Sequence, residues 1–126
     1  MSYRTPIGRA RGLGSAKDGT AHWWAQRLTA LALVPLVLWF VISVVGLIGQ
    51  GRGAVLDWIE QPVTAGLMIL LIGAVFHHGQ LGVQVVIEDY VHNEAAKLAL
   101  IVLVKFAAVV LALTGILAVL SIAFGA

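Results

Sequence analysis

The sequence contains no cysteine and few charged residues. Without cysteine the chain cannot form a disulfide, ligate an iron–sulfur cluster through thiolates or use a thiolate nucleophile. Charged residues make up 11% of the chain, against about 25% in a typical soluble domain. Hydrophobic residues occupy 60% of its 126 positions, which leaves no room for a large soluble core beside the apolar runs. The composition therefore indicates an integral membrane protein.

Signatures of several common enzyme classes are also missing. The sequence has no phosphate-binding glycine loop, no paired nucleophile and base, and no group of carboxylates and histidines spaced as in a metal hydrolase. The net charge of +2 is too small to indicate nucleic acid binding, so we expect no nucleic acid partner. The chain alone is not expected to be an enzyme.

Three long apolar runs predict an all-α membrane protein with three transmembrane helices, at about residues 22–49, 63–90 and 97–124. In the second run, the strictly apolar part ends at Phe76 and is too short to cross a bilayer. The polar segment that follows Phe76 is therefore predicted to lie inside the membrane.

Prolines and glycines predict where the helices begin, end or bend. Pro62 suits the first turn of the second helix, where its missing N–H is harmless, and Pro35 is expected to kink the first helix. The glycines Gly49, Gly51 and Gly53 predict a short loop after the first span.

Basic residues are concentrated in an N-terminal arm, residues 1–21, which precedes the membrane anchor of residues 22–126. The arm and Arg27 together carry five basic residues, and the first loop carries one. By the positive-inside rule the N-terminus is cytoplasmic, and three spans then place the C-terminus outside, in the periplasm of a bacterium. A transit peptide is the alternative interpretation of the arm.

Polar side chains in the segment Phe76–His92 are the most informative feature of the sequence. Polar groups at bilayer depth cost several kcal/mol unless they have partners, so they are candidates for function. His78 lies about 13 Å from the end of the span, and its imidazole is a suitable axial ligand for haem iron. Gly82, one turn later on the same face, would let a flat macrocycle approach. A hydrogen bond to a neighbouring helix and a proton relay are the alternatives for His78.

The neighbouring His77 cannot share a partner with His78, because adjacent helical residues point about 100° apart. Three short helices also cannot enclose a macrocycle. If His78 is an axial ligand, the second ligand is therefore expected from another subunit.

Other polar residues lie closer to the predicted membrane edges. Tyr90 lies about 18 Å from His78 along the helix axis, and it is either an interfacial belt residue or a donor to a quinone carbonyl. Arg27 either sets the topology or pairs with an anion such as a haem propionate. Lys105 is expected to extend toward the lipid headgroups.

Three features together resemble a known family. They are the segment GLGSAKDGTAHWWAQRLTALAL at the start of the first helix, the spacing His78-x3-Gly82-x6-Asp89-Tyr90, and the layout of three spans with short ends. The chain resembles the small hydrophobic membrane anchor of bacterial succinate dehydrogenase (respiratory complex II).

The resemblance implies that His78 is the axial ligand of a b-type haem, that Tyr90 contacts ubiquinone and that Asp89 supports the quinone site. It aligns Arg27 and His22 with polar groups near the haem propionates and the quinone pocket.

The resemblance also implies partners and a place in metabolism. The partners are a flavoprotein, an iron–sulfur protein and a larger cytochrome b anchor, and the cytochrome b anchor would supply the second haem ligand. The chain would be a multi-pass protein of the bacterial inner membrane, in an enzyme of the tricarboxylic acid cycle and the respiratory chain. The alternatives are the anchor of a quinol:fumarate reductase and a haem-free accessory or proton-relay protein.

Overall fold

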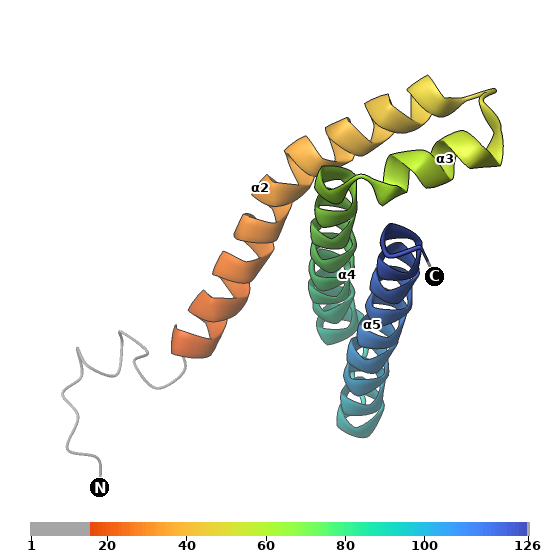
Figure 1. Ribbon diagram of the computed structural model, residues 1–126. Helices are drawn as coiled ribbons and strands as arrows, with labels where there is room; N and C mark the ends of the chain where they lie inside the picture. Colours follow the sequence, from red (N-terminus) through yellow and green to blue (C-terminus); the bar gives the residue numbers. More distant parts are fainter. Residues whose placement is uncertain (1–15, 126) are drawn as a thin grey trace, which may run out of the picture.

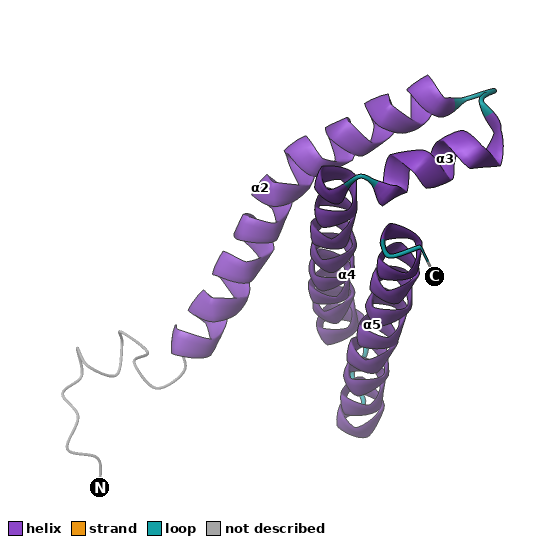
Figure 2. Cartoon of the chain, in the orientation of Figure 1, coloured by secondary structure: helices purple, strands orange, loops and turns teal. Residues whose placement is uncertain are grey.

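The computed structural model describes residues 16–125, with side chains from Thr20 onward. The described chain forms four α-helices and no strand: α2 (Ala16–Leu47), α3 (Gly51–Glu60), α4 (Pro62–Tyr90) and α5 (Glu94–Ala123) (Figure 1, Figure 2). Parts of α2, α4 and α5 are long and apolar enough to cross a membrane, which confirms the three predicted spans. The prediction of which side each terminus faces stays a prediction, and most of the N-terminal arm lies outside the described residues.

Helices α4 and α5 form an antiparallel hairpin (Figure 1). Pro62 occupies the first turn of α4, as predicted. The connection after Tyr90 is three residues long, and α5 then begins at an Asn93 cap, whose side-chain oxygen accepts a hydrogen bond from the Ala96 N–H at 3.0 Å. Because the connection is this short, the two helices are antiparallel neighbours.

Gly115 is a point of close approach between α4 and α5. A Cβ atom built on Gly115 would lie 3.3 Å from Ile72 Cδ1 and 3.5 Å from Ile72 Cγ2. Small residues of this kind let membrane helices pack closely, where dispersion forces rather than water drive association.

Replacing Gly115 with leucine should therefore overpack the hairpin and destabilise it by about 1–3 kcal/mol. The expected result is a lower melting temperature of the detergent-solubilised protein. Gly66→Leu on α4 is the matched control, because a Cβ at Gly66 would have nothing within 4 Å. Equal melting temperatures for the two variants would contradict a close contact at Gly115.

Helix α2 packs against only one helix of the hairpin. Among the described helices it packs against α4 and α3 but not α5, and none of its described residues is fully buried. The ribbon of α2 bends along its length, and Pro35 lies within it, in agreement with the predicted kink (Figure 1). Most of its apolar surface, including Leu31, Val34 and Ile42, is exposed. A helix so poorly covered needs lipid or another protein against it.

The segment after the first span contains a helix that the sequence prediction missed. Gly49 and Gly51 form the turn with positive φ angles of 83° and 84°, which favour glycine, but residues from Gly51 onward are helical. Trp58 packs on Trp39 of α2 with ring centroids 5.6 Å apart, and Ile59 is buried. The prediction of a short loop was wrong because tertiary contacts stabilise a ten-residue helix that would be marginal alone.

The small core lies at one end of the molecule. Ile59, Ala65 and Val119 come from α3, α4 and α5 and pack together where these helices meet. Toward the other end, where α2 begins and α4 finishes, Leu81 and Ile87 of α4 are also buried. Most of the candidate functional residues lie in that half of the molecule.

Candidate functional site

His78 of α4 faces α2 and contacts Thr29. The distance from His78 Nδ1 to Thr29 Oγ1 is 3.1 Å, and both side chains are partly buried. Thr29 lies about 14 Å along the helix from Thr20, where the candidate span begins. The contact therefore joins two polar side chains deep in the predicted membrane region, where each needs a partner.

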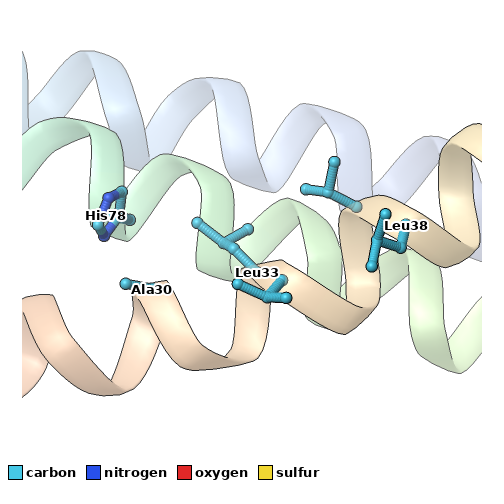
Figure 3. Close-up of a pocket in the computed structure, with 6 residues that line it drawn as sticks. Ala30, Leu33, Leu38 and His78 are labelled. Atoms are coloured by element: carbon cyan, nitrogen blue, oxygen red, sulfur yellow. The ribbon is translucent and has the colours of Figure 1, made fainter.

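Beside this contact lies a shallow apolar recess of about 440 Å³ (Figure 3). His78 supplies its one histidine, and α2 supplies the remaining wall: Ala30, Leu33, Val34, Val37 and Leu38. In Figure 3 the imidazole of His78 lies across from Ala30, whose small side chain leaves space next to the ring. An apolar wall can pack against the flat face of a macrocycle, and an imidazole beside it can ligate the metal. The residues present fit one side of a haem, and a second protein would have to cover the other side.

A row of polar residues continues from Thr29 toward the start of α2. His22, Gln26 and Thr29 are spaced by four and three positions, so they lie on one face of the helix. His22 Nε2 and Gln26 Oε1 are buried and have no hydrogen-bond partner among the described residues. Buried polar atoms without partners are rare in native structures, so this row indicates a missing partner group.

Gly82 faces this polar row. A Cβ on Gly82 would lie 3.8 Å from Gln26 Nε2, so α2 occupies the space beside this glycine. The sequence predicts that Gly82 lets a macrocycle approach, but its described neighbour is Gln26. Next to His78 the open space lies instead along α2, in the recess.

His77 belongs to a different group, on the side of α4 that meets α5. Gln80 Nε2 lies 3.4 Å from His77 Nδ1, and Lys105 Nζ donates to Gln80 Oε1 at 3.3 Å. Gln84 donates to Glu88 at 2.9 Å, so the two glutamines do not bond to each other. The two adjacent histidines thus have different contacts, His78 with Thr29 and His77 with Gln80, as the helical geometry requires.

Lys105 departs from the sequence-based expectation. Its side chain is expected to extend to the headgroups, but its ammonium group donates sideways to Gln80. Counted from the connection between α4 and α5, Gln80 and Lys105 lie at nearly the same level of the hairpin. A hydrogen bond at equal depth satisfies the cation in part without reaching the membrane surface.

Arg27, Asp89 and Tyr90 lie away from the recess. Arg27 is exposed about 160° around α2 from Thr29, and its guanidinium lies 5.3 Å from the centre of the Trp23 ring. Tyr90 is 77% exposed at the end of α4, next to the exposed Asp89. The described residues do not bring these three side chains together, so any ligand that joins them must be completed by a partner.

Sequence reasoning missed Thr29 and Gln26. A single threonine in an apolar helix carries little signal, and nothing in the sequence links it to a histidine 49 positions away. The spacing of His22, Gln26 and Thr29 could have identified a polar face on the first helix. Their partner on α4 becomes visible only in the structure.

Comparisons of the sequence with known proteins found a matching family model and several similar membrane anchor proteins. The family model described as the succinate dehydrogenase/fumarate reductase transmembrane subunit matches residues 1–112. A succinate dehydrogenase hydrophobic membrane anchor subunit from Paracoccus denitrificans is 36% identical over 112 residues, covering 89% of this chain and 87% of the relative. The protein of that name from Rickettsia bellii is 31% identical over 117 residues, covering 93% and 94%. A succinate dehydrogenase membrane anchor subunit from Reclinomonas americana is 32% identical over 96 residues, covering 74% and 80%.

Proposed function

Since this chain belongs to the family of succinate dehydrogenase and fumarate reductase transmembrane subunits, we propose that, as a succinate dehydrogenase membrane anchor, it helps to bind b-type haem and ubiquinone. The anchor role agrees with the three helices long enough to cross a membrane. The observation that carries the cofactor proposal is His78, a partly buried imidazole that lines an apolar recess at bilayer depth.

His78 is proposed as the axial ligand that this chain supplies to the haem iron. Its neighbour His77 is the weaker candidate, because it is engaged with Gln80 on the α5 side and does not line the recess beside α2. When bound, a haem supplies a one-electron redox centre. The task of the chain is to orient the imidazole, to exclude water with the apolar wall of α2 and to cover one side of the macrocycle.

The second axial ligand is proposed to come from the partner cytochrome b anchor. The recess is lined from this chain by α2 and His78 alone, and the apolar surface of α2 is largely uncovered. A second membrane protein packed there would complete the site and bury this surface. The iron–sulfur protein and the flavoprotein would then be held at the membrane by the assembled pair of anchors.

Tyr90 is proposed to donate a hydrogen bond from its phenol to a carbonyl oxygen of ubiquinone. It is exposed at the end of α4, about 18 Å along the helix axis from His78, where a quinone can reach protons at the membrane edge. Asp89 is proposed to support the same site as the adjacent acceptor. Because both side chains are exposed, the rest of the quinone site must come from partner subunits.

His22 and Arg27 are proposed to lie near the haem propionates or the quinone. His22 is supported by its buried Nε2 atom, which has no partner among the described residues and can donate to a carboxylate. Arg27 can serve a ligand only on the outer side of α2, since it lies on Trp23 and away from His78.

The direction of electron flow is proposed to be from succinate to quinone, at the bacterial inner membrane. The family includes fumarate reductase subunits, but the relatives from Paracoccus, Rickettsia and Reclinomonas are named as succinate dehydrogenase anchors. A proton-relay function is disfavoured because Asp57, Glu60, Glu88, Asp89 and Glu94 all lie in α3 or within the terminal turn of a long helix.

Deleting this chain from the natural host should release the succinate-oxidising activity from the membrane. We expect succinate oxidation with an artificial dye to move to the soluble fraction, while succinate-dependent quinone reduction is lost. Restoring the intact chain should return both activities to the membrane. Dye-linked activity that stays on the membrane after the deletion would contradict the anchor role.

A further inference from the structure

The hydroxyl group of Thr29 has its single proton committed within its own helix. Thr29 Oγ1 lies 2.6 Å from the carbonyl oxygen of Ala25 and 3.1 Å from that of Gln26. Carbonyl oxygens only accept hydrogen bonds, so the Thr29 proton points toward them, and Ala25 is the closer acceptor. The contact with His78 must therefore use a lone pair of the hydroxyl oxygen.

This arrangement assigns the tautomer of His78. Since the Thr29 oxygen accepts, His78 Nδ1 is the donor and carries a proton. In a neutral imidazole the other nitrogen, Nε2, then carries the free lone pair. In the opposite tautomer Nδ1 has no proton, so its lone pair would face a lone pair of the Thr29 oxygen at 3.1 Å. The alternative is that Thr29 donates its proton to Nδ1, which would break its 2.6 Å hydrogen bond to the Ala25 carbonyl.

We propose that Thr29 is a positioning residue that keeps the Nε2 atom of His78 free for the haem iron and tunes the potential of that haem. The proposal rests on haem ligation by His78. A hydrogen-bond acceptor at Nδ1–H fixes the ring orientation and raises the electron density on the coordinating nitrogen. More electron density on the ligand stabilises the oxidised iron, so the Thr29 hydroxyl lowers the midpoint potential.

The test compares variants of the assembled complex that keep or remove the hydroxyl. Thr29→Val and Thr29→Ala remove it, and Thr29→Ser retains it. The control is Thr114→Val on α5, where the threonine makes the same kind of hydrogen bond to the Val110 carbonyl at 2.7 Å but has no histidine partner in the described structure. The readouts are the haem midpoint potential by redox titration and the electron paramagnetic resonance spectrum of the oxidised haem.

Both hydroxyl-free variants should raise the haem midpoint potential and shift the resonance spectrum, whereas Thr29→Ser and Thr114→Val should match the wild type. Haem loss in both hydroxyl-free variants, with assembly intact and Thr29→Ser normal, would also support positioning.

Unchanged potential and spectrum in a haem-replete Thr29→Val complex would overturn the proposal and leave haem ligation by His78 standing. Failed assembly of both hydroxyl-free variants would make Thr29 a packing residue and overturn it too. Retention of haem by a His78→Ala variant would instead refute the ligation on which the proposal rests.

Discussion

His78→Ala is expected to eliminate the b-type haem from the purified complex, whereas His77→Ala leaves it in place. The two histidines are adjacent in sequence, but His78 lines the recess beside α2 and His77 contacts Gln80 on the α5 side. In the proposed site, with one ligand from this chain and one from a partner, His78→Ala would leave the iron with the partner's ligand alone. Second-sphere changes alone cost roughly 10–100-fold in metal affinity, so loss of a ligand should cost more. The measurement is the reduced-minus-oxidised absorption spectrum, scaled to the flavin content.

The pair of variants controls for folding, because both remove an imidazole from the same turn of α4. Each should retain flavin and succinate oxidation with an artificial dye, since that chemistry takes place in other subunits. Haem loss in His77→Ala with retention in His78→Ala would reverse the choice of ligand. Equal retention of haem in both variants would show that neither histidine of α4 is a haem ligand.

Tyr90→Phe is expected to reduce succinate-dependent quinone reduction by about three- to tenfold, which corresponds to one lost hydrogen bond of about 0.7–1.4 kcal/mol. The ring stays in place, and only the phenol hydroxyl is removed. Because the hydroxyl of Tyr90 is proposed to meet a quinone carbonyl, the defect should appear with ubiquinone analogues as acceptors and not with dyes that take electrons upstream.

Trp24→Phe provides the matched control for this variant. Trp24 is also exposed, near the start of α2 at the same end of the molecule, and its replacement removes a polar N–H from an interfacial aromatic residue. We expect Trp24→Phe to leave quinone reduction unchanged. A parallel loss of quinone and dye activities in Tyr90→Phe would identify a defect of assembly, and full quinone activity would identify Tyr90 as a belt residue.

The three spans could be predicted from the sequence, because a membrane span is recognised by its hydropathy and length, which do not depend on the rest of the fold. The predicted segments 22–49, 63–90 and 97–124 overlap α2, α4 and α5 almost completely. The helix α3 was missed because two of its first three residues, Gly51 and Gly53, are glycines with low intrinsic helix propensity. Its stability depends on Trp58 and Ile59, whose neighbours on other helices are visible only in three dimensions.

For the candidate site, the sequence identified the ionisable and aromatic residues but not the polar groups that hold them. His78 is unusual at its depth in a membrane span, so the cost of a polar group there singles it out. Tyr90 lies at the end of its span, where tyrosine is common, and the family resemblance singled it out instead. Thr29 is an ordinary residue in an apolar helix, and its role depends on the packing of α2 against α4. For the same reason the prediction for Lys105 was wrong, since depth along one helix does not say which neighbour lies at that level.

The most direct test of the central claim is the haem content of the purified wild-type complex. That claim is that His78 supplies one ligand of a haem bound between this chain and a second membrane protein. A reduced-minus-oxidised spectrum should show a b-type haem at one haem per flavin, with both axial positions occupied by histidine in the resonance spectrum of the oxidised form. A complex with full flavin content, intact quinone reduction and no b-type haem would contradict it.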